Sequence, residues 1–161
     1  MYEPCLLIVW HSRTGASEAL ARAVAEGAAG AGRLLAAAQT GPEDLLAAEG
    51  YVFVCPENLG TMTGQMKEMF DRCYYPVLGR IEGRPYATII AAGSDGEGAQ
   101  RQLDRIVTGW RLRRITEPAI VRLDAQTPEA ILTPKLVPAE RTREAKMLGS
   151  AFAEGLTQGI Y

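Results

Sequence analysis

Short apolar runs alternate with amphipathic stretches along most of the 161-residue chain. The apolar runs predict strands, because parallel strands that are covered on both faces are hydrophobic throughout. The predicted strands occupy residues 4–10, 33–38, 51–55, 85–92 and a part of 115–123. The stretches between them repeat apolar residues at helical spacing. They predict helices over residues 18–29, 43–48, about 62–73, about 103–110 and 139–156.

Prolines and methionines refine this pattern at three places. Pro56 is expected to end the third strand, because it has no N–H group for a strand ladder. Residues 124–138 contain three prolines and are expected to be irregular, as a loop or a partner contact. In the third helix, the apolar stripe is expected to pack in the core rather than to line a cofactor site; its members are Met62, Met66, Met69, Phe70 and Cys73.

Five strands alternating with five helices indicate an α/β fold, a doubly wound five-stranded parallel sheet with helices on both faces. We expect a single domain over residues 1–161 with the strand order 2-1-3-4-5. In that order the loops after strands one, three and four meet at the carboxyl edge, near the switch point between strands one and three. These are also the loops that are rich in Gly, Ser, Thr and Asn.

Composition and charge narrow the function classes. The content of 47% hydrophobic and 22% charged residues is typical of a globular protein, and the formal net charge of −2 favours neither nucleic acid nor an anionic membrane. No apolar run approaches the roughly 18–20 residues of a membrane span, and no signal-like N-terminal pattern is evident. The single histidine excludes a multi-histidine metal site, and three cysteines without CxxC spacing are expected as buried free thiols. A cytoplasmic location is therefore expected.

The first loop has the chemistry of an anion site. Ser12, Thr14 and Ser17 supply three hydroxyl groups between a strand and the start of a helix. N–H groups at a helix start are unpaired, and the helix dipole favours negative charge there. A phosphate is the expected ligand, although the same residues could serve only as a helix cap.

Other phosphate-binding patterns do not fit this loop. A triphosphatase loop needs Gly-Lys-Ser/Thr, whereas Gly15 is followed by Ala16. The dinucleotide pattern GxGxxG is absent after strand one, and so are the acidic residues of a receiver domain.

Three motifs in order resemble the flavodoxin-like family. HSRTGAS is similar to its phosphate-binding pattern Ser/Thr-x-Thr-Gly-x-Ser/Thr after strand one. PENLGTMTGQMKEMFDR resembles the second flavin loop and helix of the NAD(P)H:quinone reductase branch, and AGSDGEGAQRQLDRI resembles the third loop and helix of small flavodoxin-like oxidoreductases. The resemblance covers residues 4–112 and implies a flavodoxin-like fold with FMN as cofactor.

Carried over by position, the resemblance implies FMN contacts in all three loops. Ser12, Arg13, Thr14, Gly15, Ala16 and Ser17 would hold the phosphate. One side of the flavin ring would be lined by Pro56, Glu57, Asn58, Leu59, Gly60, Thr61 and Met62, and the other by Gly93, Ser94, Asp95 and Gly96. The family pattern has an aromatic residue where this chain has Leu59, and residues 91–99 contain none. Both departures leave a ring face that a nicotinamide or quinone could approach.

The resemblance implies an FMN-binding, NAD(P)H-dependent oxidoreductase that reduces quinones or similar small acceptors. The alternative is a non-catalytic flavodoxin-like electron carrier or flavin-binding module, which would bind flavin without direct NAD(P)H turnover. Hydride chemistry belongs to the cofactor, so no catalytic residue and no metal ligand is nominated. Reductases of this branch are commonly dimers or tetramers, so a homo-oligomer is expected, with no nucleic acid or membrane partner.

A few single residues keep two interpretations. Arg13 either reaches the phosphate or is solvated, and His11 is expected in a turn or beside the site rather than as a catalyst. Trp110, Tyr74 and Tyr75 are expected to pack, although the two tyrosines could instead reach a pocket or a subunit contact.

Overall fold

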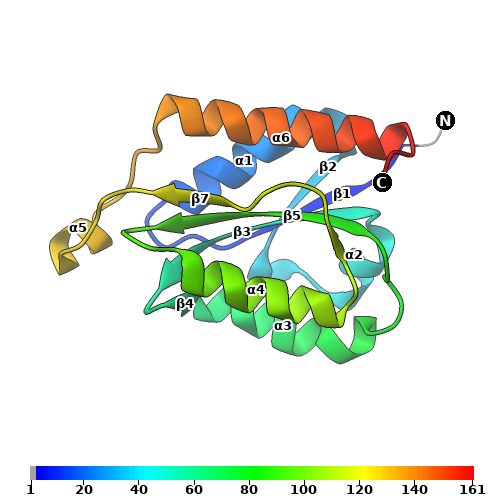
Figure 1. The fold of residues 1–161 in the computed structure, drawn as a ribbon, viewed down its shortest axis with the longest axis horizontal. Helices are drawn as coiled ribbons and strands as arrows, with labels where there is room; N and C mark the ends of the chain where they lie inside the picture. Colours follow the sequence, from blue (N-terminus) through cyan, green and yellow to red (C-terminus); the bar gives the residue numbers. More distant parts are fainter. Residues whose placement is uncertain (1–2) are drawn as a thin grey trace.

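A mainly parallel sheet separates two layers of helices in the computed structural model of the protein, which describes residues 3–161 (Figure 1). The first two residues of the expected 1–161 domain lie outside this description. The strands are β1 Leu6–Trp10, β2 Gly32–Ala36, β3 Gly50–Asn58, β4 Thr61–Met62, β5 Pro85–Ala92, β6 Arg113–Arg114 and β7 Ala119–Arg122. The helices are α1 Ala16–Ala28, α2 Pro42–Ala47, α3 Gly64–Val77, α4 Glu97–Gly109, α5 Pro128–Leu132 and α6 Ala139–Thr157, with short 3-10 turns at Ala29–Ala31 and Ala37–Gln39.

The strand order confirms the expected topology and corrects the strand count. The sheet runs β2-β1-β3-β5-β6, which is the order 2-1-3-4-5 by position. It contains seven strands rather than five, because β4 adds a short antiparallel pairing to β3 and the last position is divided between β6 and β7. Four residues, 115–118, lie opposite two of β5 at this division, and Pro118 has no N–H group with which to continue the ladder.

Polar side chains fill the interruption between β6 and β7. Asp104 of α4 accepts a hydrogen bond from the Tyr86 hydroxyl at 2.9 Å and also pairs with Arg114. Gln100 donates to the same carboxylate at 3.1 Å and accepts from the Thr88 hydroxyl at 3.0 Å. The guanidinium of Arg114 lies over the Tyr86 ring, 4.9 Å from its centroid. A connected network of side-chain hydrogen bonds thus bridges the break in this edge of the sheet.

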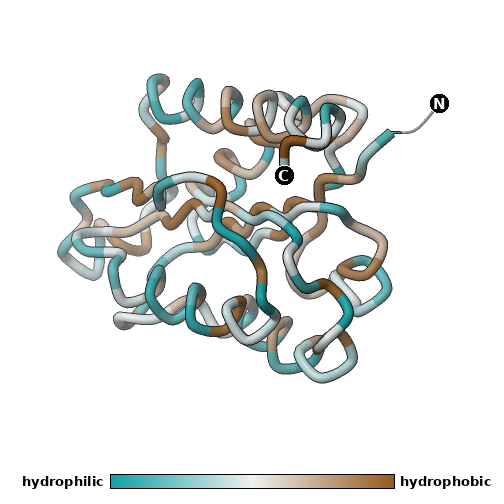
Figure 2. The backbone as a smooth tube through the Cα atoms, turned by 45° about the vertical axis from the view of Figure 1, so that its right-hand side comes forward, coloured by the Kyte–Doolittle hydropathy of each residue, from teal (hydrophilic) through white to brown (hydrophobic). Residues whose placement is uncertain are grey.

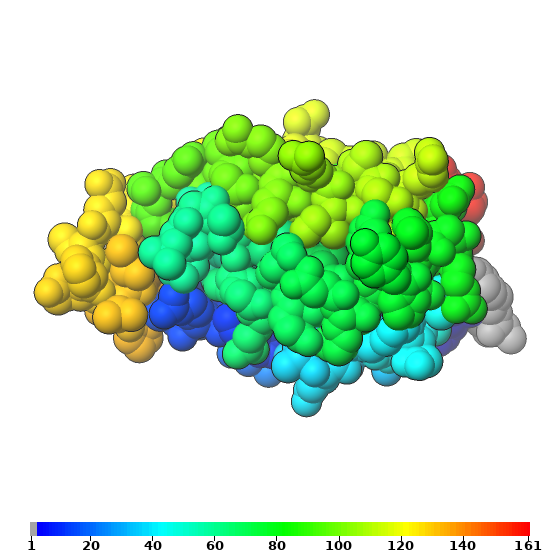
Figure 3. All heavy atoms as spheres, turned by 90° about the horizontal axis from the view of Figure 1, so that it is seen from below, coloured from blue at the N-terminus to red at the C-terminus, as the bar shows by residue number. Residues whose placement is uncertain are grey.

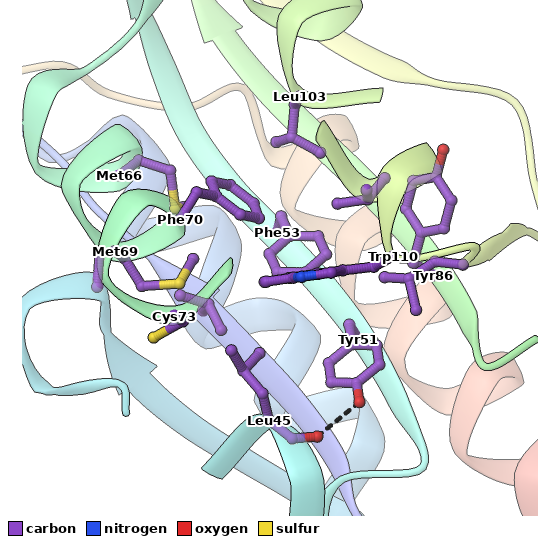
Figure 4. Close-up of a cluster of buried hydrophobic side chains, with 14 of the residues drawn as sticks. Leu45, Tyr51, Phe53, Met66, Met69, Phe70, Cys73, Tyr86, Leu103 and Trp110 are labelled. Atoms are coloured by element: carbon purple, nitrogen blue, oxygen red, sulfur yellow. Dashed lines mark hydrogen bonds between the residues drawn. The ribbon is translucent and has the colours of Figure 1, made fainter. Parts of the chain in front are cut away.

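Two hydrophobic layers hold the helices against the sheet. Long hydrophobic stretches coincide with the central strands in Figure 2, whereas the helices alternate between hydrophobic and hydrophilic positions. On the α2–α3–α4 face, Phe70 packs against both Phe53 and Trp110, with ring centroids 5.3 and 5.5 Å away (Figure 4). The methionine stripe of residues 62–73 is buried here, which confirms its packing role, although Met62 lies on β4 rather than on the helix.

The other face is covered by α1 and α6, which cross at very short distance. A Cβ atom on Gly149 of α6 would lie 2.0 Å from the carbonyl oxygen of Val24 on α1. Any side chain at this position would force the helices apart, so the close packing of this layer depends on glycine.

Two expectations about prolines were wrong. Pro56 does not end β3, because β1 pairs with that strand only as far as Val54 and Pro56 therefore removes no bond from the sheet. Residues 124–138 are not wholly irregular, since they contain α5. The hydroxyl of Thr127 accepts a bond from the N–H of Ala130 at 3.2 Å and starts this helix, with Pro128 at its first position.

Candidate functional site

The first loop joins β1 to α1 and leaves the helix start open. The N–H of Gly15 donates to the Ser12 hydroxyl at 3.0 Å, which closes the turn, and no side chain caps α1. Ser17 is only 1% exposed, and within residues 3–161 its hydroxyl oxygen has no hydrogen-bond partner. Buried hydroxyl groups are nearly always paired, so this loop has spare hydrogen-bonding capacity for a ligand.

The second loop is a tight hairpin between β3 and β4. Asn58 pairs with Thr61 across it, and the two residues between them, Leu59 and Gly60, have φ of 54° and 78°. Positive φ at both positions is typical of a type I′ turn, which is unusual for leucine. The Leu59 side chain is 93% exposed at the tip.

The second and third loops are clamped to each other through Glu57. Its carboxylate accepts bonds from the N–H groups of Gly96 at 2.9 Å and Ala99 at 3.1 Å, at the start of α4. A second connection runs from the N–H of Met62 to the Gln102 side-chain oxygen at 2.8 Å. A carboxylate at a helix N-terminus is favoured by the helix dipole, so Glu57 fixes the spacing of the two loops.

The third loop is also bound to the chain that follows β7. The N–H of Ala125 donates to the Gly93 carbonyl at 3.0 Å. A Cβ atom on Gly93 would lie 2.2 Å from the carbonyl oxygen of Ala125, so only glycine permits this approach. Residues beyond β7 therefore extend the wall that the third loop provides.

One cavity of about 320 Å³ lies where the three loops meet. Twelve of the seventeen residues expected at the site line it: Ser12, Arg13, Thr14, Ala16, Ser17, Pro56, Glu57, Asn58, Leu59, Gly60, Gly93 and Ser94. The other five lie in or next to the same loops but do not line the cavity: Gly15, Thr61, Met62, Asp95 and Gly96. The convergence of the three loops at one edge of the sheet is thus confirmed.

Several lining residues were not anticipated from the sequence. Ala91, Ala92, Leu123, Ala125, Ile131 and Lys135 complete the wall. The last four belong to the chain after β7, which projects at one end of the molecule beside the first loop (yellow to orange in Figure 3). A signal existed, because Lys135 is the only basic residue of 124–138 and this segment follows the last strand at the carboxyl edge.

The other residues singled out from the sequence lie away from the cavity wall. The Nδ1 atom of His11 is 2.7 Å from the Thr63 hydroxyl, and burial followed by the charge of Arg13 lowers its pKa. Trp110 is buried and stacks with Tyr74, as expected, whereas Tyr75 is largely exposed and contacts the Tyr74 ring edge-on, with centroids 5.2 Å apart.

The cysteines and the possible metal ligands of residues 3–161 are dispersed through the fold. The three cysteines are free thiols, and burial raises the pKa of Cys55 to about 12. Cys55 and Cys73 are buried as expected, while Cys5 is only partly covered. Among residues 3–161, no three His, Cys, Asp or Glu side chains gather as a metal site. Within the same range, no helix combines the length and hydrophobicity that a membrane crossing requires.

Comparison with known proteins identifies the family. The model of the NADPH-dependent FMN reductase family matches residues 35–126, which is more than half of the chain. The chain belongs to this family. The matched region includes the second and third loops and the first residues beyond β7, and so covers two of the three loops that form the cavity.

The proteins to which this chain is similar support a flavodoxin-like fold. A flavodoxin from Aquifex aeolicus (strain VF5) is 30% identical over 107 residues, which cover 64% of this chain and 58% of that protein. The match thus spans little more than half the length of this curated relative. A flavodoxin structure from the domain Archaea superposes with a TM-score of 0.77 at 16% identity, covering 94% of this chain and 98% of the other. A WrbA-like flavodoxin structure from Agrobacterium tumefaciens superposes with a TM-score of 0.77 at 17% sequence identity. This match covers 97% of this chain and 99% of the other.

The cavity of this family member suits a flavin mononucleotide. Its volume of about 320 Å³ lies within the range of small-molecule sites. The uncapped start of α1 and the unpartnered Ser17 hydroxyl offer donors to a phosphate at one end. Within the described chain, no aromatic side chain lines the cavity. The lack of an aromatic stacking partner, which the sequence showed at Leu59 and residues 91–99, therefore extends to the rest of the wall.

Proposed function

We propose that the protein binds FMN in this cavity and uses it to pass electrons from NAD(P)H to a small acceptor such as a quinone. The observation that carries the proposal is the buried, unpartnered Ser17 hydroxyl at the open start of α1, inside the cavity formed by all three loops. An unpaired buried hydroxyl costs stability, which is tolerable where a ligand supplies the missing partner.

The first loop would hold the phosphate. Hydroxyl groups of Ser12, Thr14 and Ser17 and the unpaired N–H groups at the start of α1 can donate to its oxygens. The positive end of the helix dipole adds electrostatic stabilisation of a dianion. These interactions would fix one end of the cofactor while leaving the ring free to be positioned by the other loops.

The second and third loops would orient the ring. Residues 58–60 and Gly93–Ser94 line the cavity, so their main-chain N–H groups are available to the ring, and the Glu57 clamp holds the two loops at a fixed separation. Bound FMN supplies the hydride and electron transfer itself. The chain's part is to bind the ring, exclude water from one side and leave the other accessible to donor and acceptor, which the absence of an aromatic cover supports.

Flavin binding is the first test. Titration of the purified protein with FMN, followed by quenching of flavin fluorescence, should show saturable binding at one site per chain. The Ser12→Ala/Thr14→Ala double variant should bind at least about tenfold more weakly, because a hydrogen bond to a charged group contributes roughly 1.5–3 kcal/mol. Wild-type protein that fails to bind FMN would refute the proposal.

Direct reduction by NAD(P)H is the second test. The FMN-loaded protein should lose its oxidised flavin absorbance on anaerobic mixing with NADPH or NADH, and regain it when a quinone is added. Reduction only in the presence of a separate partner reductase would instead identify an electron carrier. Sedimentation of the loaded protein then tests the expected dimer or tetramer.

A further inference from the structure

The chain after β7 connects the two ends of the cavity. At one end, the N–H groups of Leu123 and Ala125 donate to the carbonyls of Ala92 and Gly93 at 2.8 and 3.0 Å. At the other end, the N–H of Lys135 donates to the carbonyl of Thr14 at 2.8 Å. Residues 123–135, which include α5, thus form a strap that is hydrogen-bonded to the third loop and to the first loop. Figure 1 shows α5 beyond the carboxyl ends of the strands.

The strap places one cationic side chain, that of Lys135, beside the first loop. The ammonium of Lys135 donates to the carbonyl oxygens of Ile131, at 2.9 Å, and Thr133. These carbonyls lie at the C-terminal end of α5, where helix carbonyls have no partner within the helix. An ammonium carries three N–H groups, and the third points to the Thr14 hydroxyl, to which it donates at 3.5 Å. This contact is the longest of the three, and a phosphate oxygen at the same end of the cavity can replace it.

This charge is not neutralised by an acidic side chain. Across residues 3–161, Lys135 forms no ion pair with a carboxylate, whereas Lys67 and Lys146 pair with Asp71 and Glu26. Lys135 is also partly buried in the cavity wall, where screening by solvent is weaker than at the surface. Carbonyl dipoles orient the ammonium without cancelling its charge, so a full positive charge remains at the hydroxyl-rich end of the cavity.

We infer that Lys135 contacts the phosphate of the bound flavin and makes the site selective for a phosphorylated flavin over riboflavin. The inference rests on the proposed function and adds a specificity residue to it. The first loop contributes neutral hydroxyl and N–H donors together with the exposed guanidinium of Arg13. Lys135 adds a partly buried charge, which helps to distinguish a dianion from an uncharged ribityl chain.

The test compares two ligands on matched variants. Dissociation constants for FMN and riboflavin are measured by flavin fluorescence with wild-type protein, Lys135→Met, Lys135→Arg and Lys146→Met, at low and high salt. Lys146→Met removes the same formal charge from α6, where Lys146 pairs with Glu26 of α1 and does not line the cavity. Circular dichroism melts establish that each variant is folded.

Lys135→Met should weaken FMN binding by about tenfold or more and leave riboflavin binding within about twofold, because only FMN carries the charged partner. Lys135→Arg should retain much of the preference for FMN over riboflavin, and Lys146→Met should retain all of it. High salt should reduce this preference in the wild-type protein. Unchanged FMN binding in Lys135→Met would overturn this inference alone. Equal weakening of both flavins would also overturn it, since it would show that the strap only shapes the wall. Wild-type protein that binds neither flavin would overturn the proposed function together with this inference.

Discussion

Replacing Ser17 by alanine should stabilise the ligand-free protein and weaken its hold on FMN. The Ser17 hydroxyl is buried and unpartnered within the described chain, so the folded protein bears the cost of removing it from water. That cost is about 1–3 kcal/mol for a neutral group. With a temperature shift of roughly 2–4 °C per kcal/mol for a domain of this size, the melting temperature of the apoprotein should rise by a few degrees.

The same substitution removes a donor to the phosphate. A hydrogen bond to a charged group contributes roughly 1.5–3 kcal/mol, so the FMN dissociation constant should increase by about tenfold to a hundredfold. The variant should therefore start from a higher melting temperature and gain less from added FMN than the wild type does. Opposite signs for the two effects are what separate a ligand-binding hydroxyl from an ordinary buried serine.

Thermal melts followed by circular dichroism, with and without FMN, measure both effects. Ser150→Ala is the matched control, because Ser150 lies on α6 with an exposed side chain and gains similar helix propensity from alanine. Lower stability of the Ser17→Ala apoprotein would mean that the hydroxyl has a partner. An unchanged FMN dissociation constant would mean that it does not face the phosphate.

Three further predictions concern the clamp, the helix crossing and pH. Glu57→Gln offers one oxygen in place of the two that cap α4, so the free energy of unfolding in urea should fall by about 1–2 kcal/mol. A free energy of unfolding equal to that of the wild type would contradict the clamp. Gly149→Ala places a Cβ 2.0 Å from a carbonyl of α1 and should cost about 1–3 kcal/mol by overpacking, while a fully stable variant would show that the helices can separate freely. Burial, and then the hydrogen bond to Asp104, raises the pKa of Tyr86 to about 12 from 10. The unfolded chain therefore loses this proton first, so stability should fall as pH rises from about 10 to 12, and Tyr86→Phe should show a smaller fall in the same urea titrations.

The strands, the helix faces and the meeting of the three loops followed from local patterns. Apolar runs such as residues 85–92 need no long-range information, because a strand buried on both faces has only hydrophobic choices. The Gly, Ser and Thr residues after three of these runs indicated which loops meet, and the resemblance of these loops to the flavodoxin-like family indicated the residues, twelve of which line the cavity.

The features that were missed depend on contacts between distant parts of the chain. Nothing in the sequence around Lys135 shows that its N–H binds Thr14, 121 positions earlier. Pro56 looked like a strand end because the sequence does not reveal that β3 has lost its β1 neighbour at that point. Likewise, Glu57 was expected to contact the cofactor, and its bonds to the start of α4 appear only once the two loops are side by side.

The interrupted last strand has a consequence for the behaviour of the protein in concentrated solution. An exposed strand edge attracts strands of other chains, and short, irregular and charged edges resist such pairing. This edge offers only the two residues of β6 and the four of β7, displaced from each other by residues 115–118 and carrying Arg113, Arg114 and Arg122. We therefore expect copies of the protein to resist joining into a continuous sheet at the β6–β7 edge, which leaves β2 as the edge strand where such pairing is less hindered.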